Sequence, residues 1–143
     1  MAAERSAKIR KTFNGLNKDT MYLIDEFYAP EIVFEDPLHR IEGRAKLTDY
    51  YKGLYRSVRS IHFDIFDEVV QGDKHVIFWK MRLEAPGLNG GKPYMTSGSS
   101  LIHFNAQDMV AFHRDYFDMG EFIYEQIPVL KNLIKAIRTR LTN

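Results

Sequence analysis

The 143-residue sequence contains no cysteine, a single tryptophan and no long apolar run. The absence of cysteine excludes disulfide bonds, thiolate metal ligands and a cysteine nucleophile. Its 20 basic and 19 acidic residues leave a net charge of +1, which provides no overall field to hold nucleic acid or an acidic membrane. Residues 1–11, MAAERSAKIRK, resemble neither a secretory signal nor a membrane span, so the cytoplasm is the default location.

The remaining composition is that of an ordinary globular protein. Apolar residues make up 45% of the sequence and charged residues 27%, which are values typical of a soluble domain. A chain of this length suits one domain with one hydrophobic core. We therefore expect a single domain over residues 1–143.

The spacing of apolar residues changes from helical to strand-like along the chain. Helical spacing predicts helices over residues 4–14, about 17–28 and 43–58, and the second and third are separated by a short strand, EIVFEDP, and a loop, LHRIEG. From Ser60 the period is two, which predicts four strands over residues 60–70, 75–85, 94–104 and 110–118. This order favours an α+β fold, in which a curved and mostly antiparallel sheet is folded over the helices.

A further amphipathic helix is predicted for about residues 119–141. Asp118 followed by Glu121 resembles a capping box, and Pro128 predicts a kink or a restart. From residue 126 onward the segment has no acid and four basic residues, which are Lys131, Lys135, Arg138 and Arg140. Such a helix can lie on a membrane surface or bind a partner. Packing on its own sheet or across a dimer is the favoured interpretation, because cations are also stabilising near a helix C-terminus.

Residues 112–118, FHRDYFD, combine aromatic side chains with ionisable ones. In a strand, His113, Asp115 and Phe117 share one face. If that face meets the core, an imidazole and a carboxylate are carried into apolar surroundings, and their burial needs a reason. One reason is proton transfer, with a buried acid shifted in pKa and a histidine beside it. The alternative is structural, with Asp115 paired to the Trp79 indole, a tyrosine or an arginine, and His113 hydrogen-bonded in the core.

Two stretches resemble known enzymes. FYAPEIVFEDP, residues 27–37, is similar to the stretch of ketosteroid isomerases that carries the general base, which falls on Asp36. RDYFD, residues 114–118, is similar to the final strand of limonene epoxide hydrolases, whose general acid falls on Asp115. With the order of its elements, the chain resembles the nuclear-transport-factor-2-like superfamily over roughly residues 5–127. The resemblance implies a cone-shaped fold, in which the sheet wraps over the N-terminal helices.

The resemblance does not extend to every partner group of these two reactions. The oxyanion-hole residues of the isomerase fall on Thr12 and near Ser100. The arginine and the second aspartate of the epoxide hydrolase fall on or near Trp79 and Met81. The resemblance therefore implies neither steroid isomerisation nor epoxide hydrolysis. The SnoaL-like polyketide cyclases of the same superfamily require less, since an inward acid or base near an apolar pocket is sufficient.

The resemblance also implies a cavity inside the cone. There we expect Asp115 to act as acid or base, His113 as its partner and Asp36 as a second carboxylate that can differ from Asp115 in pKa. The expected substrate-binding side chains are Phe34, Tyr51, Tyr55, Trp79, Met81, Ser100 and Phe117. For Asp36 the structural alternative is an acid before proline that caps a turn. The aromatic side chains can likewise serve packing alone.

Two functions remain open from the sequence. The first is a SnoaL-like protein that binds a small hydrophobic molecule, with cofactor-free acid/base chemistry of the isomerase, cyclase or dehydratase type. The second is a non-catalytic ligand-binding or dimerisation module whose interior is filled by its own side chains. A pocket of about 300 Å³ or more with Asp115 at its wall would favour the first.

The sequence also bears on metal ions, cofactors and oligomeric state. No metal site is predicted, because the five histidines show no paired spacing, and no cofactor is expected. The resemblance implies a homodimer, for which an isologous interface is the usual symmetry.

Overall fold

The structure, a computed structural model, describes residues 1–118 and 128–142. The helices of this part are α1 (Ala2–Gly15), α2 (Tyr22–Phe27), α3 (Arg44–Tyr55) and α5 (Pro128–Thr142), with a short 3-10 turn at Asn89–Gly91. The strands are β1 (Tyr28–Glu35), β2 (Arg40–Glu42), β3 (Ser60–Gln71), β4 (Lys74–Glu84), β5 (Tyr94–Phe104) and β6 (Val110–Phe117). They form one sheet in the order β2-β1-β6-β5-β4-β3. Strands β1 and β6 are parallel, and all other neighbours are antiparallel.

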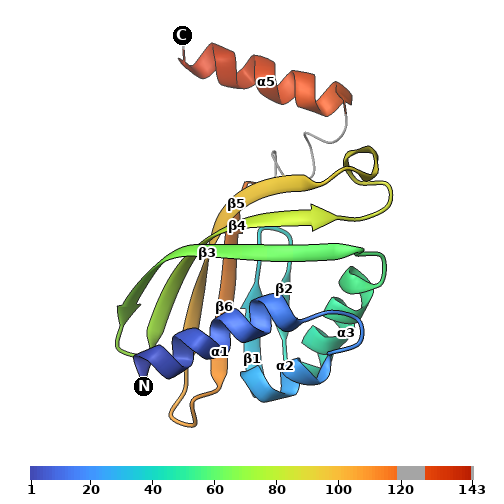
Figure 1. Cartoon of the computed structure of the whole chain (residues 1–143). Coiled ribbons are helices and arrows are strands. Elements are labelled where there is room, and N and C mark those ends of the chain that lie inside the picture. Colours follow the sequence, from blue (N-terminus) through green and yellow to red (C-terminus); the bar gives the residue numbers. More distant parts are fainter. Residues whose placement is uncertain (119–127, 143) are drawn as a thin grey trace.

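The long strands β3 to β6 curve, and α1, α2 and α3 lie against the sheet (Figure 1). Helix α1 contacts β3, whereas α3 contacts β1 and β2. The predicted α+β architecture, a curved and mostly antiparallel sheet over N-terminal helices, is confirmed. The core lies between these two layers.

Alternation along β4 shows how the sequence selects the inner face. Its buried apolar side chains are Ile77, Trp79, Met81 and Leu83. Lys80 and Arg82 lie between them in sequence and are exposed on the opposite face. Burying an apolar side chain of this size contributes roughly 1.5–3 kcal/mol, so a one-residue slip in register would lose most of the sheet's packing.

Arg5 fixes α1 across the sheet. Its side chain is only 10% exposed and ion-paired with Asp73, in the turn after β3. The guanidinium donates hydrogen bonds of 2.8 Å to Asp73 and to Asp108, which precedes β6. Because both hairpin turns hold the same arginine, the first part of α1 is fixed beside these two turns.

Two predicted boundaries in the first half of the chain are wrong. The second helix ends at Phe27, because Tyr28 is already extended, with φ −95° and ψ 139°. Tyr28 instead begins β1 and pairs with Val110 of β6. The predicted loop LHRIEG contains the short strand β2, which pairs with β1.

Helix α5 stands clear of the sheet (Figure 1). It begins at Pro128, whose fixed φ suits the first helical turn. The predicted residues 119–127 of this helix, including the capping residue Glu121, lie outside the described residues. Leu133, Ile137 and Leu141 are exposed. Packing of these three side chains on the chain's own sheet is therefore wrong, whereas packing across a dimer stays a prediction.

Candidate active site

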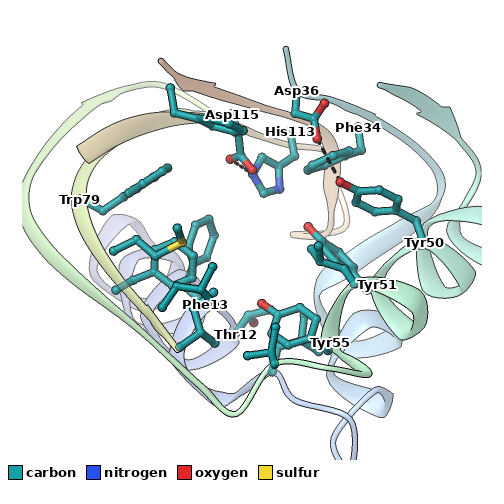
Figure 2. A pocket seen from close by; sticks show the side chains of 18 of the residues that line it. Thr12, Phe13, Phe34, Asp36, Tyr50, Tyr51, Tyr55, Trp79, His113 and Asp115 are labelled. Carbon is teal, nitrogen blue, oxygen red and sulfur yellow. Dashed lines mark hydrogen bonds and ion pairs between the residues drawn. The ribbon is translucent and has the colours of Figure 1, made fainter. Parts of the chain in front are cut away.

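A cavity of about 240 Å³ lies between the inner face of the sheet and helices α1 and α3 (Figure 2). Its wall is mostly apolar and aromatic, as in most small-molecule sites. The ionisable acid and base groups in the described wall are the carboxylates of Asp36 and Asp115 and the imidazoles of His39 and His113, without lysine or arginine. The cavity is smaller than the 300 Å³ expected for a clear pocket, but the interior is not filled by its own side chains.

The cavity brings together most of the predicted site. Its wall includes the predicted Phe34, Asp36, Tyr51, Tyr55, Trp79, Met81, His113, Asp115 and Phe117. The prediction that Ser100 lines the cavity is wrong, because this residue is fully buried and is not part of the cavity wall. It lies behind the wall, where its hydroxyl contacts both Trp79 and Asp115.

Asp115 has one carboxylate oxygen fixed and the other open. Oδ1 accepts hydrogen bonds of 2.6 Å from Ser100 Oγ and from His113 Nε2. Among the described residues nothing donates to Oδ2, and the side chain is 21% exposed. The register explains the first contact, since Ser100 of β5 is paired with Asp115 of β6. A carboxylate held in this way is a positioned acid or base.

A chain of hydrogen bonds continues from Asp115 to α3. His113 Nδ1 lies 2.7 Å from the Tyr28 hydroxyl, which lies 3.3 Å from the Tyr51 hydroxyl. When His113 donates from Nε2 to Asp115, Nδ1 accepts from Tyr28, and Tyr28 accepts from Tyr51. In this arrangement each hydroxyl and the Nε2–H group donates one hydrogen bond. The His113 ring is 1% exposed and stacks on Phe13 with 5.6 Å between ring centroids, so its orientation is fixed.

The tyrosines around the cavity remain protonated donors. Burial raises the pKa of four of them above the ordinary value of 10.0: Tyr28, Tyr50, Tyr51 and Tyr55. The negative charge of Asp115 adds to the rise in pKa of all four. Raised pKa values favour the protonated folded state, so this part of the stability is complete below pH 10 and is lost above it.

An alkaline titration checks this. We expect the four tyrosines of the cavity wall to ionise only as the protein unfolds, at a pH above 10. The free energy of unfolding should fall by up to about 1.4 kcal/mol per pH unit for each buried tyrosine above pH 10. Ultraviolet absorbance of the phenolate follows the ionisation, and circular dichroism follows the unfolding in the same sample. Reversible ionisation of these four tyrosines near pH 10 while the protein stays folded would contradict the assignment.

Asp36 has both carboxylate oxygens engaged. Oδ1 accepts the backbone N–H of Leu38 at 2.8 Å and of His39 at 2.7 Å. Oδ2 accepts the Tyr50 hydroxyl at 3.1 Å, and the side chain is 9% exposed. These contacts match the structural alternative, an aspartate before proline that caps the following turn. The arrangement leaves Asp36 no free oxygen, and its catalytic role stays a prediction.

Trp79 and Gly98 complete the support of Asp115. Trp79 Nε1 donates to Ser100 Oγ at 2.9 Å, and Ser100 donates to Asp115. Gly98 is paired with Trp79 across β4 and β5, and a Cβ at this glycine would lie 2.5 Å from Trp79 Cη2. The indole therefore occupies the space that only glycine leaves, and its N–H is aimed at the serine that holds Asp115.

Sequence reasoning missed Tyr28 and Gly98. Tyr28 has the same strand parity as the buried Ile32 and Phe34, but the helix predicted through Tyr28 hid this signal. Nothing in the sequence marks Gly98, since its role depends on the approach of an indole from a neighbouring strand. Among the described residues, no three histidine, aspartate or glutamate side chains are arranged to hold a metal ion.

The curved sheet, the covering helices and the cavity between them form a cone-shaped fold. The sequence matches the model of the SnoaL-like domain over residues 9–113. The chain belongs to the SnoaL-like family.

Solved structures with low sequence identity share the fold. An LEH-like epoxide hydrolase of M. tuberculosis superposes with a TM-score of 0.72 at 16% identity, covering 94% of this chain and 97% of its own. A hypothetical protein of Catenulispora acidiphila with a ketosteroid isomerase-like fold, in complex with trimethylamine, gives 0.70 at 15% identity, covering 84% and 89%. TerC, co-crystallised with polyporic acid, gives 0.68 at 13% identity, covering 80% and 92%. No curated protein sequence matched the chain.

Proposed function

We propose that the chain is a SnoaL-like enzyme that takes a small hydrophobic molecule into the cavity and moves a proton on it without a cofactor. The reaction would be of the isomerase, cyclase or dehydratase type. The observation that carries the proposal is Asp115, with one oxygen held by two donors and the other open in the wall of an apolar cavity. Two proteins of the same fold were solved with small organic molecules, trimethylamine and polyporic acid, which supports small-molecule binding here.

Tyr55 supplies a complementary group across the cavity. Its hydroxyl points inward from the side opposite Asp115 (Figure 2). Within the described chain this hydroxyl makes no hydrogen bond. Burial and the charge of Asp115 raise the pKa of Tyr55 above 10.0, so the hydroxyl stays protonated and can donate. A base and a donor facing each other in an apolar space suit proton transfer next to a carbonyl group.

The proposed reaction passes through an enolate. Asp115 Oδ2 takes a proton from the carbon beside the carbonyl group. The electron pair of the broken C–H bond forms a double bond to the carbonyl carbon, and the π pair of the C=O bond moves to the oxygen. The resulting enolate accepts a hydrogen bond from Tyr55, which is worth more in a cavity that excludes water. Where the substrate has a carbon–carbon double bond next to that carbon, the enolate extends to a dienolate, and return of the proton from Asp115 to the far carbon of the dienolate completes an isomerisation. The absence of cationic side chains from the described cavity wall favours neutral substrates over carboxylates or phosphates.

Trp79 provides a readout of binding, because it is the single tryptophan of the sequence and lies in the cavity wall. We expect 2-tetralone, a small neutral ketone, to change its fluorescence saturably. Tyr55→Phe should weaken this binding roughly fivefold, the value of one ordinary hydrogen bond. Tyr22→Phe, at an exposed tyrosine outside the cavity, should leave it unchanged. No saturable change, or equal affinity with and without the Tyr55 hydroxyl, would contradict the proposal.

The second candidate is a non-catalytic ligand-binding module of the same fold. It is favoured by the engagement of Asp36 and His113 in internal hydrogen bonds, which is typical of structural networks. It predicts ligand binding without any turnover that depends on Asp115. The homodimer and the cytoplasmic location stay predictions, and exposed apolar residues of the outer sheet face, such as Val69 and Tyr116, would suit an isologous interface.

A further inference from the structure

Helix α5 has an apolar stripe that no described residue covers. Leu133, Ile137 and Leu141 are 55%, 52% and 81% exposed. They are spaced four residues apart, so they follow one side of the helix. The helix itself stands away from the sheet (Figure 1). Arg138 of this helix donates a hydrogen bond of 2.8 Å to Asp118, and this contact does not cover the stripe.

The same helix carries an excess of positive charge. Residues 128–142 contain four basic residues and no acid, although the whole chain carries only +1. Taking +4 from +1 leaves −3 for the remaining residues. Arg138 and Arg140 flank the stripe on its two sides, and Lys135 lies on the opposite face. Arginines at the edges of an apolar stripe can extend their charged ends toward a polar layer while their stems follow the apolar surface.

We propose that α5 lies in the surface of an anionic lipid bilayer, with Leu133, Ile137 and Leu141 toward the acyl chains and its cations among the headgroups. A helix with an apolar face and a basic polar face binds in this way. No described helix is long and apolar enough to cross a membrane, and α5, with 15 residues, is shorter than the roughly 20 that a span requires. The helix therefore lies along the surface. This inference does not depend on the chemistry of the cavity.

Charge favours the bilayer over a second copy of the chain. Two α5 helices packed stripe to stripe would bring eight cations together, with Asp118 paired to Arg138 in each copy and no acid in either helix, within the range where like charges repel. An anionic headgroup layer instead attracts each cation. The net negative remainder of the chain is repelled by that layer, so α5 is the part that would face it.

Co-sedimentation with lipid vesicles tests the proposal. We expect the full chain to pellet with vesicles of phosphatidylcholine and phosphatidylglycerol, to pellet much less with phosphatidylcholine alone, and to be released by salt. Leu133→Asp should abolish pelleting. Arg140→Gln, at the edge of the stripe, should weaken binding roughly fivefold, the value of one lost charge. The matched controls Tyr22→Asp, at an exposed apolar residue of α2, and Lys52→Gln, at an exposed lysine of α3, should bind as wild type does.

Three results would overturn the proposal. The first is no pelleting of wild type with anionic vesicles. The second is equal pelleting of wild type and Leu133→Asp. The third is sedimentation equilibrium showing that Leu133→Asp converts a dimer into a monomer while wild type ignores lipid, which would assign the stripe to a second copy.

Discussion

Asp115→Asn is expected to lower turnover by roughly 10²–10⁴-fold, the usual contribution of a positioned acid or base. The amide oxygen can still accept the hydrogen bonds of Ser100 and His113, so the side chain should keep its position. The amide nitrogen that replaces Oδ2 cannot take a proton. Binding of 2-tetralone, measured by Trp79 fluorescence, should persist, because the cavity keeps its shape.

The control for this variant is Asp64→Asn. Asp64 is an exposed acid of β3, paired with Lys80 on the outer face of the sheet. Its replacement removes a carboxylate of the same type without touching the cavity, so turnover should be unchanged. Full turnover in Asp115→Asn would show that the role of Asp115 is wrongly assigned. An unfolded Asp115→Asn protein would favour the structural alternative for this carboxylate.

Gly98→Ala is expected to destabilise the protein by about 1–3 kcal/mol, the usual cost of overpacking. The new Cβ would lie 2.5 Å from Trp79 Cη2 and 2.7 Å from the Tyr116 carbonyl oxygen. The carbonyl belongs to the backbone of the neighbouring strand and cannot move without distorting the strand pairing, so the indole has to shift. That shift pulls the Trp79 N–H away from Ser100, which loosens the support of Asp115. Chemical denaturation measures the loss of stability, and the emission of Trp79 reports its displacement.

Gly53→Ala is the matched control for the glycine variant. Gly53 lies in the exposed part of α3, and a Cβ added there meets nothing within 4 Å. Alanine in a helix interior is more stable than glycine by up to about 1 kcal/mol, so this variant should unfold at a higher denaturant concentration than wild type. A Gly98→Ala protein as stable as wild type, with unchanged emission, would show that the indole does not depend on this glycine.

The sheet was predictable because apolar and polar side chains alternate along its strands, and this alternation determines which face of each strand is buried. In β4 the apolar Trp79 and Met81 alternate with Lys80 and Arg82, and the same parity placed Asp115 and His113 inward on β6. Alternation does not show how far a helix extends when its last residue also begins a strand. Tyr28 was therefore assigned to the wrong element, and its hydrogen bond with His113 was missed.

The site was predictable at the level of which residues face inward, and less so at the level of their contacts. Ser100 was expected in the cavity wall because of the resemblance to cone-shaped proteins, and its strand position does face inward. The structure places it behind the wall because the larger Trp79 side chain on the neighbouring strand covers it and donates to it. Such contacts depend on side-chain volumes across strands. The local sequence around Ser100 and Gly98 does not contain that information.

The most direct test of the central claim is deuterium exchange into 2-tetralone in heavy water, followed by proton NMR with wild type and with Asp115→Asn. If the open oxygen of Asp115 removes a proton beside the carbonyl group, wild type accelerates the exchange, and the variant, although it binds the ketone equally well, does so roughly 10²–10⁴-fold less. A ketone that changes Trp79 fluorescence in both proteins, yet exchanges no faster with wild type than with the variant, would contradict the account.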